Sequence, residues 1–280
     1  MSKKTDIATI ISNQQLAPGI FSMWLRTEIA KDAPAGQFIN VYTRDNAKLL
    51  PRPISICEID HTGRIRIVFR VVGKGTDEIS TYADGETLKI TGPLGNGYQS
   101  AMDVQIEKSK EDVLYPFDTN QLQIDEDKEV LIMGGGIGIP PMLGLAKELK
   151  CKKKIVVGYR SDQELFLTRE LNENGEVFIA TDDGSFGTHG TVIDCVKENG
   201  IAADMIFACG PKPMLRGIKE LGEQLNVPTF ISMEERMACG VGACLACVCK
   251  STDVDEHSKV NNKRVCVEGP VFIAGEVDLA

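Results

Sequence analysis

The stretch Leu131–Leu149, LIMGGGIGIPPMLGLAKEL, decides how the second half of this 280-residue chain folds. A short apolar strand runs into a group of glycines, and a helix opened by two prolines follows. Proline fits the first turn of a helix because the N–H that it lacks has no partner there. Glycine lets the backbone approach a ligand, and the free N–H groups of a helix N-terminus favour a phosphate. The candidate nucleotide contacts are Gly134, Gly135, Gly136 and Gly138.

The glycines by themselves are explained about equally well by a tight turn and by a nucleotide-binding loop. They do not form the GxGxxG motif, because the sixth residue counted from Gly134 is Ile139 and not glycine. A second loop favours the nucleotide. Residues 206–215, IFACGPKPML, have the pattern of a strand that ends at Cys209 and Gly210 and is followed by a helix. Two such loops at the carboxyl ends of parallel strands would face one crevice. Cys209 is then either a neighbour of a nicotinamide or an ordinary buried thiol.

Residues 129–232 alternate between apolar strands and helical stretches, which predicts a nucleotide-binding domain with a parallel sheet and helices on both faces. The expected strands are Val130–Met133, Ile155–Gly158, Val177–Thr181 and Met205–Ala208, and the expected helices are Pro140–Leu149, Asp162–Asn172, Thr191–Asn199 and Lys212–Asn226. The choice between NAD and NADP stays open. Arg160 and Ser161 suit a 2′-phosphate, whereas Asp162 or Glu164 would repel it and bind a ribose hydroxyl.

Residues 1–100 have the pattern of an antiparallel β-barrel. The stretch Arg64–Val72, RIRIVFRVV, places apolar residues on one face and mainly arginines on the other, as in a half-buried strand. Six such runs separated by turn residues indicate closure, which removes exposed edges. The other expected strands are Ile7–Ile11, Phe21–Arg26, Phe38–Thr43, Ile54–Ile59 and Thr87–Thr91. The polar and acidic residues 101–128 predict a linker or an insertion loop.

Arg52 stands between two prolines in LPRPISICEID, residues 50–60. Because proline lacks an N–H, it is confined to strand beginnings or edges, and Arg52 is held on a stiff, partly exposed backbone. A fixed guanidinium suits a pyrophosphate. Taken alone, however, the motif is explained better by a surface arginine flanked by turn prolines.

Five of the nine cysteines lie near the end of the chain, four of them in MACGVGACLACVC, residues 237–249. Cys239, Cys244 and Cys247 have the spacing C-x4-C-x2-C of plant-type two-iron, two-sulfur centres, whereas zinc ribbons favour two C-x2-C pairs. Cys266 is preferred as the fourth ligand. Its rival, Cys249, follows Cys247 by two residues, and a strand-like run would point it elsewhere. Residues 233–280 therefore predict a third unit that depends on a metal centre for its fold.

Composition narrows the class of protein. A net charge of −9 and a pI near 5.0 oppose nucleic-acid binding. No apolar run reaches the ~18 residues of a membrane span. The N-terminus has no signal-peptide pattern, and an odd number of cysteines then indicates a reducing, cytoplasmic compartment. Neither a Ser/His/Asp arrangement nor a pair of carboxylates stands out. We therefore predict no catalytic side chain, and we expect the chemistry to belong to cofactors.

Several motifs together resemble the ferredoxin–NADP reductase superfamily: RPIS (52–55), VFR (68–70), GT (75–76), GPLGNGY (92–98), GGGIGIPPM (134–142) and CGPKPM (209–214). The resemblance implies a flavin in the barrel and a nicotinamide nucleotide on the α/β domain. It places FAD contacts at Arg52, Pro53, Ile54, Ser55, Val68, Phe69, Arg70, Gly75 and Thr76.

The tail, MEERMACGVGACLACVCK (233–250) followed by VCVEGPVF (265–272), is similar to the electron-transfer subunits of dihydroorotate dehydrogenase B. This implies iron ligands at Cys239, Cys244, Cys247 and Cys266. It also implies an FMN-containing catalytic subunit as partner, in a heterotetramer with two copies of each chain. Electrons from dihydroorotate would pass through the 2Fe–2S cluster and FAD to NAD+, in pyrimidine biosynthesis. Two alternatives remain: a subunit of a ferredoxin-dependent NADP(H) transhydrogenase or sulfide-type reductase, and a zinc-stabilised binding module.

Overall fold

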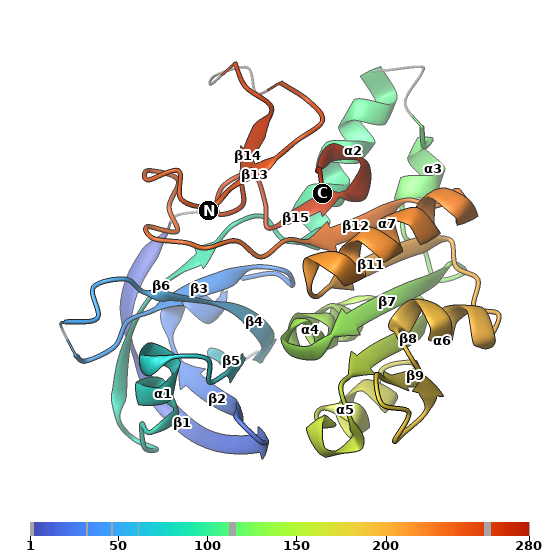
Figure 1. The fold of residues 1–280 in the computed structure, drawn as a ribbon. Helices are drawn as coiled ribbons and strands as arrows, with labels where there is room; N and C mark the ends of the chain where they lie inside the picture. Colours follow the sequence, from blue (N-terminus) through green and yellow to red (C-terminus); the bar gives the residue numbers. More distant parts are fainter. Residues whose placement is uncertain are drawn as a thin grey trace.

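The structure, a computed structural model, describes residues 3–31, 33–45, 47–60, 62–111, 116–254 and 259–279. Its N-terminal unit is a closed antiparallel barrel with the strand order β1-β2-β5-β4-β3-β6, as the sequence predicts (Figure 1). Pairing of the last strand with the first closes the barrel. The strands are β1 (Lys4–Ala17), β2 (Ile20–Arg26), β3 (Phe38–Val41), β4 (Arg52–Asp60), β5 (Arg64–Arg70) and β6 (Thr87–Leu94).

Alternate residues of each strand fill the barrel. Ile65, Ile67 and Phe69 of β5 point inward and are almost fully buried, in one cluster with Ile39 and Val41 of β3. Two short elements complete this unit: the 3-10 helix η1 (Glu28–Lys31) and the helix α1 (Lys74–Ser80), which contributes Ile79 to the same core.

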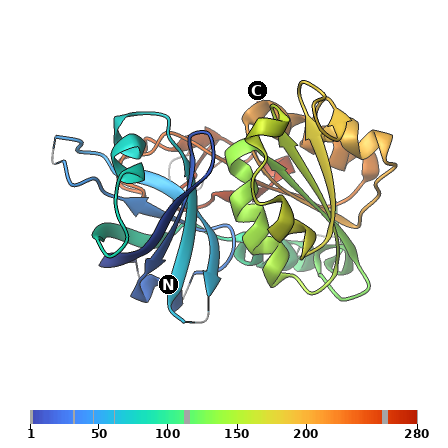
Figure 2. The same ribbon diagram turned by 90° about the horizontal axis from the view of Figure 1, so that it is seen from below.

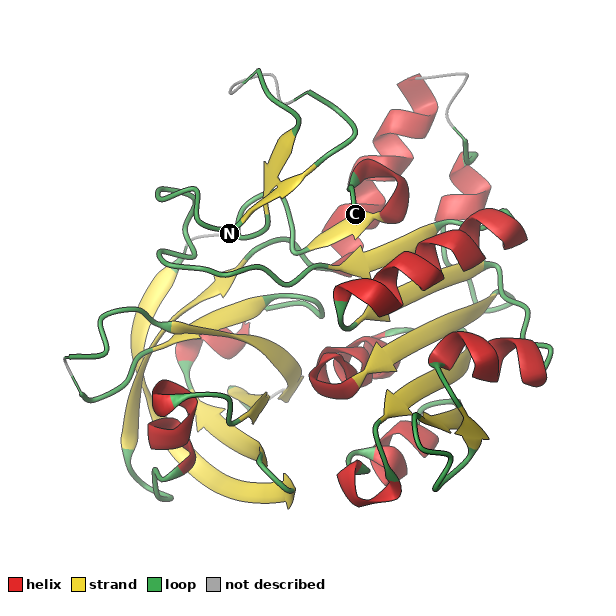
Figure 3. Cartoon of the chain, viewed as in Figure 1, coloured by secondary structure: helices red, strands yellow, loops and turns green. Residues whose placement is uncertain are grey.

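The second unit is a seven-stranded sheet of order β10-β9-β8-β7-β11-β12-β15, with helices on both faces (Figures 2 and 3). The strand pairs from β10 to β12 are parallel, which confirms the predicted fold class. The strands are β7 (Glu129–Gly135), β8 (Lys152–Tyr159), β9 (Glu176–Thr181), β10 (Thr188–His189), β11 (Met205–Cys209), β12 (Thr229–Ser232) and β15 (Val271–Ile273).

Successive residues of β7 show why both faces of this sheet are apolar. Val130 and Ile132 pack in the cluster that includes α4 and α5, whereas Leu131 and Met133 pack in the cluster that includes α6 and α7. A strand buried on both sides therefore has a continuous apolar run. The helical elements are η2 (Gly136–Gly138), α4 (Ile139–Glu148), η3 (Asp162–Glu164), α5 (Thr168–Asn172), α6 (Val192–Glu198) and α7 (Lys212–Leu225).

The structure corrects two predictions about secondary structure. The helix expected over Asp162–Asn172 is split into η3 and α5, because Phe166 is buried between them and Leu167 has a left-handed backbone with φ 61°. Residues 101–128, expected as a linker or an insertion loop, are not a loop throughout, because they include most of α2 (Tyr98–Glu111) and all of α3 (Thr119–Leu122). Residues 112–115 of that stretch lie outside the described part of the chain.

The cysteine-rich region is joined to both other units. After β12 the chain passes over the barrel, turns through β13 (Val248–Lys250) and β14 (Asn262–Arg264), and returns to pair β15 antiparallel with β12. The 3-10 helix η4 (Ala274–Glu276) follows. Figure 1 shows this segment in red above the barrel and beside the sheet. Residues 255–258 of this predicted unit are not described.

The barrel and the sheet domain meet at a buried group of charges. Arg66, which alternation in β5 predicts on the polar face of a half-buried strand, is 7% exposed. Its guanidinium contacts Glu58 of β4 at 3.1 Å and Glu170 of α5 at 2.5 Å, and Lys147 of α4 also pairs with Glu58. Nearby, Gly144 of α4 packs against the backbone carbonyl of Cys57 so closely that a Cβ would collide with it. The arginine is therefore buried because a second domain covers this face of the barrel.

Candidate functional site

Arg52 lies at the start of β4, beside the first turn of α1. Together with residues 72–76 it lines a shallow cavity of about 210 Å³. Gly75 allows this packing, since a Cβ there would collide with the Arg52 guanidinium. The Thr76 hydroxyl accepts from the N–H of Val72 at 2.9 Å and of Gly73 at 3.3 Å, and so holds the loop that lines the cavity. A fixed cation beside a glycine-containing turn is an arrangement that suits a phosphate.

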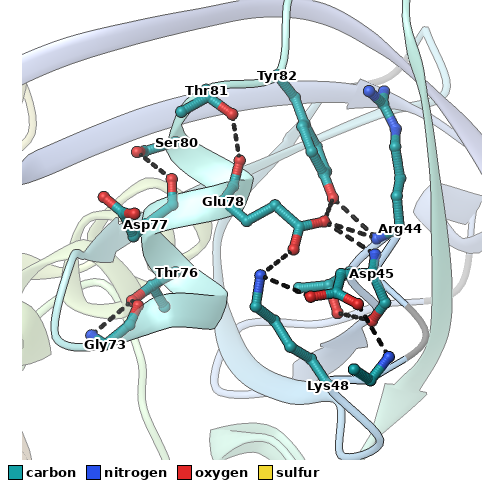
Figure 4. Close-up of polar contacts among 12 residues, drawn as sticks. Arg44, Asp45, Lys48, Gly73, Thr76, Asp77, Glu78, Ser80, Thr81 and Tyr82 are labelled. Atoms are coloured by element: carbon teal, nitrogen blue, oxygen red, sulfur yellow. Dashed lines mark hydrogen bonds and ion pairs between the residues drawn. The ribbon is translucent and has the colours of Figure 1, made fainter.

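The loop that leads to Arg52 is anchored by Glu78 of α1, a residue that sequence reasoning missed (Figure 4). The Glu78 carboxylate accepts from the backbone N–H of Arg44 at 2.8 Å and of Asp45 at 3.2 Å. It also accepts from Lys48 Nζ at 2.5 Å and from the Tyr82 hydroxyl. Burial opposes the charge, but these donors outweigh it and lower the pKa of Glu78 to about 2. The local sequence gives no sign of this role, because three of the four donors, Arg44, Asp45 and Lys48, belong to the distant loop after β3.

The other residues implied as flavin contacts differ in exposure. In the RPIS motif Pro53 is exposed, Ser55 is half-buried and Ile54 is buried. The side chains of Val68 and Phe69 are also buried, and the Phe69 ring stacks on Phe21 inside the barrel with 6.0 Å between centroids. Any contact of these last two residues with a ligand would therefore involve their backbone groups.

Arg70 connects the barrel to the glycine loop. Its guanidinium pairs with Glu164 of η3 at 3.2 Å and lies 3.9 Å from the position of a Cβ on Gly136. Gly136 has φ 52°, a backbone conformation that glycine adopts at little cost. Because Glu164 is paired with Arg70, it is less suited to bind a ribose hydroxyl than the exposed Asp162.

The two loops predicted to share a crevice do lie side by side. Gly134 of β7 is in register with Cys209 of β11, and a Cβ on Gly138 would collide with the Cys209 carbonyl. Gly135 and Gly210 both pack on the Met214 side chain at the start of α7. Burial raises the pKa of the Cys209 thiol to about 12, so this thiol is neutral near pH 7. The crevice thus offers backbone groups and two helix starts at the carboxyl edge of the sheet.

The four predicted iron ligands lie as two neighbouring pairs. In the first pair, the Cys244 sulfur accepts from the backbone N–H of Cys239 at 3.4 Å. The Cys239 sulfur accepts from the N–H groups of Val241 at 3.4 Å and Ala243 at 3.3 Å. Burial opposes ionisation of Cys239, but these N–H groups and the Cys244 thiol lower its pKa to about 6. Backbone donors to sulfur are a feature that stabilises thiolate ligands.

The second pair is Cys247 and Cys266, and both side chains are almost fully buried. Burial and the adjacent Cys247 thiol raise the pKa of Cys266 to about 12, and Cys239 adds to the effect. Cys249, by contrast, donates to the Lys263 carbonyl at 3.4 Å. In the described part of the chain, no group of three or more His, Cys, Asp or Glu side chains is arranged to bind a single metal ion. Two thiol pairs, one for each iron, fit a two-iron centre.

Asn40 of β3 is a second residue that sequence reasoning missed. It is fully buried, and its Nδ2 donates to the Cys239 carbonyl at 3.0 Å. The signal was present in the sequence, because Asn40 is a lone amide in the otherwise apolar strand FINV.

An arginine-lined cavity on a barrel, a nucleotide-type crevice on a parallel sheet and a cysteine-lined loop define a flavin- and nicotinamide-dependent reductase with an iron–sulfur centre. A family model for the "Iron-sulfur cluster binding domain of dihydroorotate dehydrogenase B" matches residues 234–278. The "Dihydroorotate dehydrogenase B (NAD(+)), electron transfer subunit" of Geobacillus sp. (strain WCH70) is 39% identical over 282 residues, which cover 99% of each chain. The protein of that name from Streptococcus pneumoniae serotype 4 is 38% identical over 96% of this chain and 99% of its own length. The chain belongs to this family of electron-transfer subunits.

Solved structures support the same architecture. A chain from the structure of an NADH-dependent reduced ferredoxin–NADP oxidoreductase is 27% identical, with a TM-score of 0.79 over 99% of this chain and 91% of that chain. The ferredoxin reductase of carbazole 1,9a-dioxygenase, at 18% identity, shares the fold with a TM-score of 0.61 over 81% of this chain and 68% of its own. Among the described residues, no helix is both long and apolar enough to span a membrane.

Proposed function

We propose that this chain is the electron-transfer subunit of a dihydroorotate dehydrogenase that uses NAD+ as its final acceptor. When bound, FAD exchanges two electrons with the nicotinamide and single electrons with the 2Fe–2S cluster, so the flavin must lie between them. The partner is an FMN-containing catalytic subunit that oxidises dihydroorotate, and the complex is a cytoplasmic heterotetramer with two copies of each chain. Full-length similarity to electron-transfer subunits of this name supports the assignment.

One observation carries the proposal: the barrel contacts both other binding elements. On one side Arg70 lies beside the glycine loop at Gly136. On the other side Asn40 donates to the cysteine loop at Cys239. A flavin held by the barrel would then lie between a nucleotide and an iron–sulfur cluster, which is the order that electron transfer requires.

The residues divide by role. Arg52 and the turn at Gly75 and Thr76 would hold the FAD pyrophosphate, and Pro53, Ile54, Ser55, Val68, Phe69 and Arg70 would border the rest of the cofactor. The glycines of the nucleotide loop, with Cys209 and Gly210, would bind NAD. Cys239, Cys244, Cys247 and Cys266 would ligate the cluster. The corresponding units are the barrel (1–100), a connecting segment (101–128), the nucleotide domain (129–232) and the cluster domain (233–280).

The test is reconstitution with the partner. The chain is produced with and without a dihydroorotate dehydrogenase catalytic subunit, and flavin, iron and acid-labile sulfide are measured in each sample. The complex should form NADH from dihydroorotate and NAD+, and the catalytic subunit alone should not. A complex that carries FAD and iron but forms no NADH would contradict the proposed function.

A second candidate is the flavin and iron–sulfur subunit of a ferredoxin-dependent NADP(H) transhydrogenase. The likeness to a chain of an NADH-dependent reduced ferredoxin–NADP oxidoreductase favours it, since that match covers almost the whole chain. Identification of the subunit that co-purifies with this chain distinguishes the two. The zinc-binding alternative finds no support, because the matching family model describes an iron–sulfur cluster domain.

A further inference from the structure

The cysteine loop, residues 237–246, rests on the barrel through Asn40 of β3. Along this strand Ile39 and Val41 point into the barrel core, so Asn40 points to the other side, toward the loop. Its side chain is fully buried, and Nδ2 donates to the carbonyl of Cys239 at 3.0 Å. The contact therefore reaches the backbone of a cluster ligand itself.

Gly240, the next residue in the loop, packs directly against the side-chain amide of Asn40. Its φ is 67°, and a Cβ there would lie 2.5 Å from Asn40 Nδ2 and 3.0 Å from Oδ1. A side chain at position 240 would push the loop away from β3. The absence of one lets the loop backbone close onto the Asn40 side chain.

Asn40 also adjoins the strand that carries the predicted flavin contacts. In the sheet register its partners are Pro53 of β4, inside the RPIS motif, and Thr91 of β6. The peptide that holds Cys239 is thus joined, by one hydrogen bond, to the strand next to the flavin strand.

The energetics argue against a purely structural role for this amide. Asn40 Oδ1 is buried and has no hydrogen-bond partner among the described residues. Burial of an unpartnered polar atom disfavours the fold, and an apolar residue of similar size, such as leucine, would avoid that cost. We propose that Asn40 is a positioning residue, which holds Cys239 and the cluster at a fixed place relative to the flavin site. This inference rests on the proposed function.

The test compares Asn40→Leu with the control Asn13→Leu in the full chain, purified with its cofactors and partner. Asn13 is a matched control because its Nδ2 also donates to backbone carbonyls, of Ser80 and Tyr82, and its Oδ1 is also unpartnered. Its two acceptors, at the end of α1 and just after it, belong to the barrel unit and lie outside the cysteine loop. Flavin and iron contents of the wild-type protein are measured first. If the wild-type protein contains neither flavin nor iron, the proposed function fails, independently of the role of Asn40.

The first measurement is amide hydrogen exchange. Loss of one hydrogen bond of ordinary strength should speed exchange in residues 237–246 by about tenfold in Asn40→Leu, and leave it unchanged in Asn13→Leu. The second follows the iron–sulfur absorbance after anaerobic mixing with NADH. Reduction of the flavin should keep its rate, whereas reduction of the cluster should slow by about an order of magnitude, as expected when a reacting group is misplaced.

Equal exchange and equal cluster reduction in Asn40→Leu and the wild-type chain would overturn the proposal. If Asn40→Leu does not fold, Asn40→Ala is measured instead, since it removes the donor and adds no bulk. Gly240→Ala should reproduce the slower cluster reduction, because its methyl group displaces the loop from Asn40. The effects of Asn40→Ala and Gly240→Ala should be non-additive in the double variant, whereas strict additivity would show that the two residues do not act together.

Discussion

Cys249 and Cys266 are both buried thiols of the cysteine-rich region, but their surroundings differ. Cys266 lies against Cys247, whereas Cys249 bonds to the Lys263 carbonyl. We therefore expect Cys266→Ser to lose the cluster and Cys249→Ser to keep it, since a thiolate ligand is lost in the first variant alone. Iron, sulfide and visible absorbance of the purified complex measure the outcome. Loss of iron from Cys249→Ser, with retention in Cys266→Ser, would reverse the ligand assignment.

Arg52 is the residue on which flavin affinity should depend most. Removal of a charge-assisted hydrogen bond costs about 1.5–3 kcal/mol, so Arg52→Ala should weaken FAD binding by roughly 10- to 100-fold. Gly75→Ala should have a similar effect, because its Cβ displaces the guanidinium. Arg26→Ala is the control. Arg26 is exposed and pairs in register with Arg64, which in turn pairs with Asp60 at the end of β4 opposite to Arg52. Fluorescence titration of the apoprotein with FAD gives the affinities, and unchanged binding by Arg52→Ala would refute the role.

The candidate site was predictable to the extent that its signals are local in the sequence. Three of the four iron ligands stand in one C-x4-C-x2-C run, and the glycine loop is one continuous strand–turn–helix segment. Asn40 and Glu78 were missed because their partners lie elsewhere. The acceptor of Asn40 is 199 positions away, and three of the four donors to Glu78 come from the loop after β3. Such contacts exist only once the chain has folded.

At the scale of elements, α1 depends on the ionised Glu78 for its attachment to the loop after β3. The pKa of Glu78 is lowered from 4.5 to about 2 in the folded protein, so its contribution is present above pH 4.5 and is lost as the pH falls toward 2. Glu78→Gln should lower the free energy of unfolding at pH 7 by about 1–3 kcal/mol. The difference between the variant and the wild-type chain should shrink at pH 3. Thermal unfolding at both pH values measures it, and a constant difference would contradict the assignment.

The elements themselves show why a barrel and a sheet were predictable and α2 was not. Strand alternation and the strand–glycine–helix pattern are strong periodic signals. In α2 the buried residues Tyr98, Ala101, Met102 and Gln105 do follow helical spacing. The surrounding polar residues, however, give the segment the composition of a loop. The polar composition is consistent with a helix, because α2 packs on the rest of the protein through one narrow face and its other residues are not buried.

At the scale of the whole molecule, the relative position of the barrel and the nucleotide domain decides whether flavin and nicotinamide can meet. Arg66 of β5 holds these units together through Glu58 and Glu170, and its Nε donates to the Ser22 hydroxyl at 2.8 Å. Lys147 adds a second contact from α4 to Glu58. No local pattern distinguishes Arg66 from Arg64, because the two residues are two positions apart in β5 and so lie on the same face of the strand. The difference comes from the second domain.

Those two arginines provide a matched pair of variants. Arg66→Met removes one partner from a buried charge network, which typically costs about 3–5 kcal/mol, and Glu58 keeps Lys147 as its remaining partner. Arg64→Met removes a more exposed pair with Asp60, which contributes less than about 1 kcal/mol. We expect the larger loss of unfolding free energy in Arg66→Met, together with slower reduction of bound FAD by NADH. Equal losses in the two variants would show that the barrel and the nucleotide domain are held together by apolar packing alone, with no measurable share from these charges.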